Sequence, residues 1–199
     1  LYDNIRSFFR TGYNQKHNLS FEGGNEAFTY RWSNEYNDNT GITPNTRYTR
    51  ISSRLAATAK FGEKLNINTS FSYTNSDNDK ARKGADGYMV TLLRFNPMAD
   101  VRQWIDEKGN RVLHSGTIYS EFDNPFWDVY RNTSFDKVNR MMANSNIMYR
   151  PSKWLSVNGI LGLDYSFTHG ESVYHNQSYL GSGSEGDPTG GKISVYDRT

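Results

Sequence analysis

Residues 28–36, with the sequence FTYRWSNEY, decide the fold because aromatic and polar side chains alternate along them. The even positions hold Phe, Tyr, Trp, Asn and Tyr, whereas the odd positions hold Thr, Arg, Ser and Glu. Successive side chains of a β-strand point to opposite faces of its sheet. The segment therefore predicts a strand with one aromatic face and one polar face.

The same alternation recurs along the chain. Its further instances are residues 49–61 (TRISSRLAATAKF), 65–73 (LNINTSFSY) and 155–167 (LSVNGILGLDYSF), with weaker versions in residues 13–21 and 140–149. A seventh strand is expected to begin near Lys192. We therefore expect an all-β chain of six strands, each of about 9 to 13 residues, and part of a seventh.

The expected connections between these strands are alternately short and long. The short ones are residues 23–26, 62–64 and 150–154, and the long ones are residues 38–48, 75–138 and 169–191. Every second turn of a meander lies at the same end, so one end has tight turns and the other has long loops. Outer-membrane β-barrels have this layout, and the strands are long enough to cross a bilayer when tilted.

Aromatic residues at the expected strand ends support the barrel. They are Tyr13, Tyr36, Tyr73, Tyr149, Trp154 and Tyr165. Tyr and Trp gather where a membrane meets water. The alternative, a soluble antiparallel sandwich, also alternates, but its strands usually have about 5–6 residues. The predicted fold class is thus an antiparallel meander forming part of a large transmembrane β-barrel.

The alternation assigns the strand side chains to two faces. The residues expected to face lipid are Phe28, Tyr30, Trp32, Ile51, Leu55, Ile67, Phe71, Val157, Leu161 and Leu163. The residues expected to face the interior are Arg31, Glu35, Arg50, Arg54, Asn68, Arg140, Asn158 and Asp164. That interior face is either a hydrated wall of partly compensating charges or a slightly basic surface for a plug or an anionic substrate. A turn at residues 150–154 would pair Tyr149 with Leu155, which sets Arg140 opposite Asp164.

The connection over residues 75–138 is too long for a plain hairpin loop. Residues 86–95 predict a short helix that Asp86 can cap, and residues 104–112 predict a small hairpin. The aromatics expected to be exposed on this loop are Trp104, Tyr119, Phe122, Phe126 and Trp127. An exposed apolar patch usually marks an interaction site, although folding back onto neighbouring loops would also bury these rings.

Several segments resemble one family when they are read as strings. The clearest is residues 19–50, LSFEGGNEAFTYRWSNEYNDNTGITPNTRYTR, with its GGN hairpin followed by GITPNT. It is similar to the first barrel strands of the SusC/RagA family of TonB-dependent outer-membrane transporters of Bacteroidetes. Residues 1–13 resemble the stretch that links the plug domain to the barrel in that family. Residues 96–98 and 122–131 (FDNPFWDVYR) resemble the proline-marked segments of its first large outer loop.

The resemblance implies an importer of glycans or other bulky nutrients in the bacterial outer membrane. Its implied partners are a SusD-like surface lipoprotein, outer-membrane lipid, and TonB through a segment not in this chain. Residues 1–199 would be the N-terminal portion of the barrel domain, without the plug domain and the remaining strands, and residues 75–138 would be its extracellular loop. The alternatives are a passive porin, whose strands would look the same, and a surface β-sandwich binding module.

The sequence offers little for other kinds of function. A formal net charge of +2 gives no electrostatic argument for nucleic-acid binding, and the chain has no Cys. Residues 181–186 match G-x-G-x-x-G, but no helix is expected to follow them, and residues 77–79 fit a solvated loop tip better than a calcium loop. His169 and His175 lie in an expected loop and are a weak zinc candidate. We expect no catalytic residues, no cofactor and no metal, and therefore no enzyme.

Overall fold

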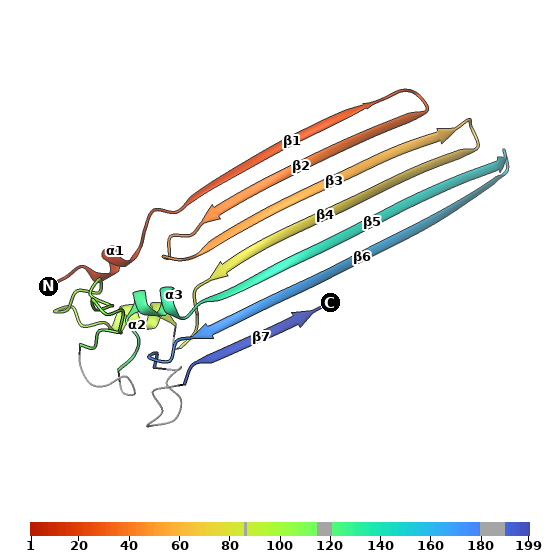
Figure 1. Ribbon diagram of the computed structural model, residues 1–199. Helices are drawn as coiled ribbons and strands as arrows, with labels where there is room; N and C mark the ends of the chain where they lie inside the picture. Colours follow the sequence, from red (N-terminus) through yellow and green to blue (C-terminus); the bar gives the residue numbers. More distant parts are fainter. Residues whose placement is uncertain (86, 115–120, 180–189) are drawn as a thin grey trace.

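The computed structural model describes residues 1–85, 87–114, 121–179 and 190–199. Within these residues, seven strands form one antiparallel sheet in chain order, as the sequence predicted (Figure 1). The strands are β1 (Tyr13–Gly24), β2 (Phe28–Thr40), β3 (Arg47–Phe61), β4 (Leu65–Lys80), β5 (Ser134–Ser152), β6 (Leu155–Tyr174) and β7 (Lys192–Arg198). The sheet is open, since β1 and β7 form its two edges.

The strands are longer than expected at the end with the long connections. β4 continues to Lys80 and β5 begins at Ser134, so the connection between them is residues 81–133. The backbone ladder continues through Asn, Asp and Ser side chains that interrupt the apolar alternation. Residues 77–79, expected at a loop tip, accordingly lie in β4, and His169 lies in β6. The alternation thus marks only part of each strand.

The register places the two expected sets of side chains on opposite faces. Phe21 pairs with Trp32, and Trp32 pairs with Leu55. The row continues across the sheet through Phe71 and Ala143 to Leu163. Every residue expected to face lipid shares the face of this row, here called the apolar face. Every residue expected to face the interior shares the other face, here called the polar face.

The predicted register of β5 and β6 is wrong by two residues. Tyr149 pairs with Val157 rather than Leu155, and a bulge follows before Ser152 pairs with Leu155. The turn is therefore shorter than the predicted turn of residues 150–154. Arg140 and Asp164 still share the polar face and form an ion pair across the diagonal, with Nε to Oδ1 at 2.8 Å. The parity of the prediction was correct, and only the turn length was wrong.

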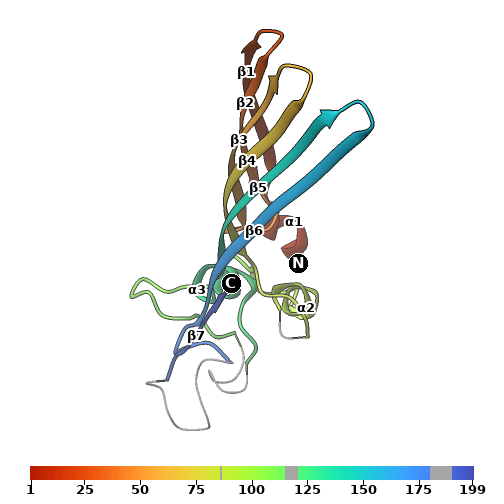
Figure 2. The same cartoon turned by 90° about the vertical axis from the view of Figure 1, so that its right-hand side faces the viewer.

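Three short helices in the described residues lie at the end with the long connections (Figures 1 and 2). They are α1 (Asn4–Phe8), α2 (Tyr88–Arg94) and α3 (Pro125–Arg131). The buried apolar residues lie on these helices and their connection, and not on the sheet: Phe8, Leu92, Val101, Trp127 and Val129. No described helix is both long and apolar enough to cross a membrane.

Residues 1–12 also lie at this end, because β1 starts where β2 ends, with Tyr13 beside Thr40. The segment before β1 and the long connections therefore share one end of the sheet.

Candidate functional site

The apolar face of the sheet carries large side chains that nothing in the described residues covers. Leu161 is 66% exposed and Leu163 is 61% exposed, and large side chains with exposures between 38% and 68% occur on this face from β2 to β7. Figure 2 shows the strands running clear of the helices for most of their length. A water-soluble antiparallel sheet normally packs one face on a core. This face instead presents a continuous apolar surface.

A row of tyrosines crosses the apolar face inside the strands. Tyr73 and Tyr165 both pair with Met141, and Tyr36 lies one row further toward the long connections, opposite Ile51. The expectation that these three tyrosines lie at strand ends is wrong, because the strands continue past them. Beyond the row the same face carries charged residues among apolar ones. The apolar residues there include Phe135, Ile193 and Val195. The charged residues there are Asp38, Arg47, Asp77, Asp79, Lys137, Glu171 and Asp197.

The height of the apolar band can be worked out on β3. The band runs from Ile51, beside the tyrosine row, to Phe61 at the tight turn. Ten steps of about 3.4 Å give roughly 34 Å along the strand. A tilt of about 45° reduces this to roughly 24 Å, close to the ~25 Å apolar band of outer-membrane barrels.

The polar face carries charges that partly compensate one another. Lys16 lies 2.8 Å from Glu35, and Arg31 lies 3.8 Å from Glu22. Hollows in the sheet are lined mostly by side chains of this face, including Arg54, Asn68 and Asn144. A charged, hydrated surface with hollows suits a face that borders water.

The long connection folds into a small apolar cluster with α1. Phe8 is buried against Tyr88 and Phe126, with ring centroids 5.4 Å and 5.0 Å away. The cluster therefore fixes residues 1–12 onto the long connection.

The two local structures predicted in the long connection are both present in part. α2 confirms the helix predicted over residues 86–95, but its N-cap is Gly87, and Asp86 lies outside the described residues. The predicted hairpin is a single bridge between Ile105 and Arg111.

The sequence analysis missed α3, although its start carries a recognisable signal. Asn124 caps the helix through its side chain, and Pro125 occupies the first turn, where it loses no hydrogen bond. The helix turns Trp127 inward, so the expected exposure of this residue is wrong: its exposed fraction is 0%. The indole Nε1 of Trp127 donates to Ser178 Oγ at 2.8 Å.

The other aromatics expected on this loop are in mixed environments. Trp104 and Phe126 are half-buried, whereas Phe122 is exposed with the Arg94 guanidinium over its ring. Trp104 stacks on exposed Tyr130 at 5.4 Å. Tyr119 and residues 181–186 lie outside the described residues. A partner could reach Phe122 and Tyr130 but not Trp127.

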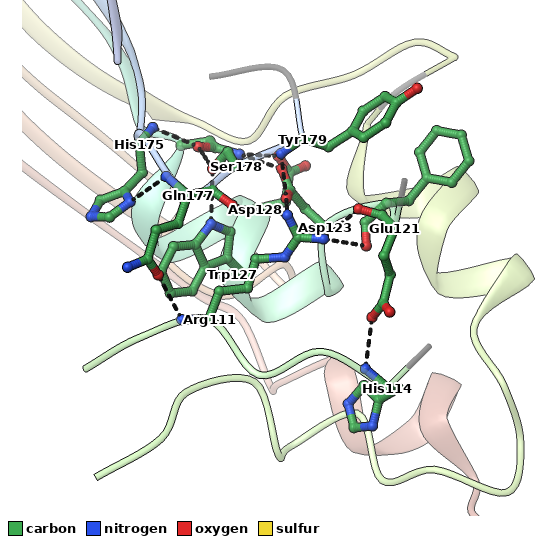
Figure 3. Close-up of polar contacts among 12 residues, drawn as sticks. Arg111, His114, Glu121, Asp123, Trp127, Asp128, His175, Gln177, Ser178 and Tyr179 are labelled. Carbon is green, nitrogen blue, oxygen red and sulfur yellow. Dashed lines mark hydrogen bonds and ion pairs between the residues drawn. The ribbon is translucent and has the colours of Figure 1, made fainter. Parts of the chain in front are cut away.

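A buried polar network joins the long connection to the segment after β6 (Figure 3). Arg111 and Asp123 form an ion pair at 2.9 Å, and each side chain is 1% exposed. The Arg111 guanidinium also donates to the carbonyl oxygens of Gln177, at 2.9 Å, and of Glu121. Asp123 accepts from the backbone N–H of Tyr179 at 2.9 Å. We call this arrangement the Arg111 network.

Burial changes the acid–base behaviour of this region. It raises the pKa of Asp128 to about 6, against the pull of the Arg82 guanidinium 2.9 Å away. Burial likewise raises the pKa of Asp123 and lowers the pKa of Arg111. These residues are far apart in the sequence, so their meeting had no local signal. The described residues contain no group of three or more His, Asp or Glu arranged for a metal ion.

Comparison with known proteins gives a structural likeness only. No family model matches the chain, and no curated protein matches it. The chain is similar to a solved structure, the RagAB peptide importer in its "closed-closed" state, with a TM-score of 0.68 and 19% sequence identity. The match covers 89% of this chain and 20% of that chain, so this chain spans about one fifth of the importer chain. At this identity the likeness establishes the fold.

Proposed function

We propose that this chain is part of the barrel wall of a TonB-dependent outer-membrane importer of the SusC/RagA type. The observation that supports it best is the apolar face, whose large side chains are exposed over a band of membrane height. Lipid would cover that band, whereas water would make it an aggregation surface. An open sheet would leave unpaired backbone groups in lipid, so β1 and β7 would pair with further strands of a closed barrel.

In this proposal the polar face lines the interior and the long connections lie outside the cell. The hollows and ion pairs of the polar face suit a water-filled interior. Residues 81–133 would then be an extracellular loop, and residues 1–12 would lie at the same outer end. A plug domain and the segment that contacts TonB would belong to other parts of the protein.

The cargo in this proposal is a bulky nutrient, such as a glycan or a peptide. A SusD-like lipoprotein would meet the loop through exposed side chains such as Phe122 and Tyr130. Support for this partner comes from the family resemblance and from the likeness to a peptide importer. A passive porin would share the strands, and its uptake would not depend on TonB.

Two adjacent residues of β6 provide a matched test of the membrane arrangement. Ile160 is on the polar face and Leu161 on the apolar face, and they are 67% and 66% exposed. A nitroxide label would replace each residue in turn in the full-length protein, reconstituted in lipid bilayers. We expect oxygen to reach the label at 161 more readily, and a water-soluble nickel complex to reach the label at 160. Equal accessibility at both sites would contradict a lipid-facing apolar face.

A further inference from the structure

Two arginines on the polar face have no partner among the residues that the structure describes. Arg50 and Arg54 lie four residues apart on β3, so their side chains point from the same face about 13 Å apart along the strand. No hydrogen bond or ion pair of either guanidinium occurs within the described ranges. The Nε atom of Arg50 is buried and unsatisfied. A buried donor without an acceptor costs free energy, so this site favours an added acceptor.

Two carboxylates of the polar face on either side of these arginines are already engaged. Glu35 pairs in register with Ser52, which lies between the two arginines, but its carboxylate contacts Lys16 at 2.8 Å. On the other side, Asp164 contacts Arg140 at 2.5 Å. The acidic groups flanking the pair therefore leave its two positive charges uncompensated.

Arg50 and Arg54 line a hollow together with short residues of β4 and β6, which include Ser70, Ser72, Thr74 and Gly162. Asp164 also lines this hollow, with its carboxylate engaged by Arg140. Because the serine and threonine side chains are short, an anion can approach the guanidinium groups from the interior. The hydroxyl groups can donate further hydrogen bonds to its oxygens. The hollow thus offers hydroxyl donors beside positively charged guanidinium groups.

We propose that this hollow is an anion site that binds a carboxylate group. A guanidinium presents parallel N–H donors at the spacing of carboxylate oxygens, which favours this anion. The carboxylate comes either from an acidic cargo or from an acidic side chain of another segment of the same protein that enters the interior. The inference rests on the proposed function only in that the polar face must border water.

The test uses the full-length protein in detergent with succinate as the probe. Phenylglyoxal modifies free arginines, and mass spectrometry measures the extent of modification at each one. We expect succinate to slow modification of Arg50 and Arg54 but not that of Arg31, which already has Glu22 beside it. In calorimetric titrations, R50Q or R54Q should weaken succinate binding about tenfold or more, the loss of one charge-assisted interaction. Lys60→Gln removes a charge from the same face of β3 outside the hollow and should leave affinity unchanged.

A second arm identifies a carboxylate that the protein itself supplies. In that case both arginines resist phenylglyoxal before succinate is added. Arg54→Lys then provides an amine that a carbodiimide can couple to the neighbouring carboxylate, and peptide mapping identifies it. The proposal is overturned if both arginines react freely with succinate present and no coupled product forms. The labels at 160 and 161 report separately on the membrane arrangement, so either idea can fail alone.

Discussion

Replacing Arg111 by Met should release the long connection from the segment after β6 while leaving the sheet intact. Methionine retains much of the volume of arginine but removes the charge, so Asp123 becomes a buried carboxylate without its counter-ion. Removing one partner of a buried ion pair costs about 3–5 kcal/mol. The lost hydrogen bonds to the carbonyl oxygens of Glu121 and Gln177 are included in that range. Since the partners of Arg111 given above lie in residues 121–123 and at Gln177, the cost falls on this region.

Hydrogen exchange of the full-length protein in detergent measures this loss directly. The amide of Tyr179 donates to Asp123 and should exchange about 100-fold faster or more in R111M, as expected for a loss of at least ~3 kcal/mol. Amides in β5 and β6 should keep their rates. The double variant R111M/D123L removes both charges and should recover part of the protection of the α3 amides, whereas Tyr179 stays unprotected because it loses its acceptor. Unchanged exchange at Tyr179 in R111M, or faster exchange spread evenly over the strands, would refute the reasoning.

Four further outcomes follow from the structure. Leu161→Arg should reduce folding stability in bilayers by ~2–4 kcal/mol if it lies near the midplane, and a neutral result would count against lipid exposure. A double-mutant cycle of Arg140 and Asp164, both about half exposed, should give a coupling of at most ~1 kcal/mol. Because the pKa of Asp128 is raised to about 6, the folded loop binds a proton that the unfolded loop lacks as pH falls below 6. Exchange in α3, corrected for intrinsic rate, should therefore slow from pH 7 to pH 5, and D128N should reduce that change, leaving the part that Asp123 contributes. Deleting residues 84–130 should leave the barrel inserted but weaken lipoprotein capture or uptake, and lost assembly would instead show a structural role.

The strands and their faces could be predicted because alternation is a local property of the sequence. Residues 28–36 contain enough of it to fix which side chains share a face. The strand boundaries at the tight turns were predicted more closely than the strand boundaries at the long connections. Past Tyr73 the apolar side chains give way to polar ones, although the hydrogen-bonded ladder of β4 continues to Lys80. Side-chain polarity reports the environment of a face, and not where backbone pairing stops.

The Arg111 network could not be predicted in the same way. Arg111, Asp123 and Ser178 come from separate segments, and nothing in their spacing indicates that they meet. The burial of Trp127 depends on Ser178 and His175, which pack against the indole. An aromatic residue in a long loop was therefore taken as exposed when tertiary contacts enclose it.

The tyrosine row inside the strands has a consequence for the path of a cargo. β6 continues from Tyr165 to Tyr174, nine further steps of about 3.4 Å, which at a tilt of about 45° rise roughly 20 Å. If the row marks the membrane surface, the strands would form a protein-walled vestibule above the lipid. A cargo would leave bulk water and meet this rim before it reached the depth of the bilayer. Capture and membrane passage would then take place at different heights of the same wall.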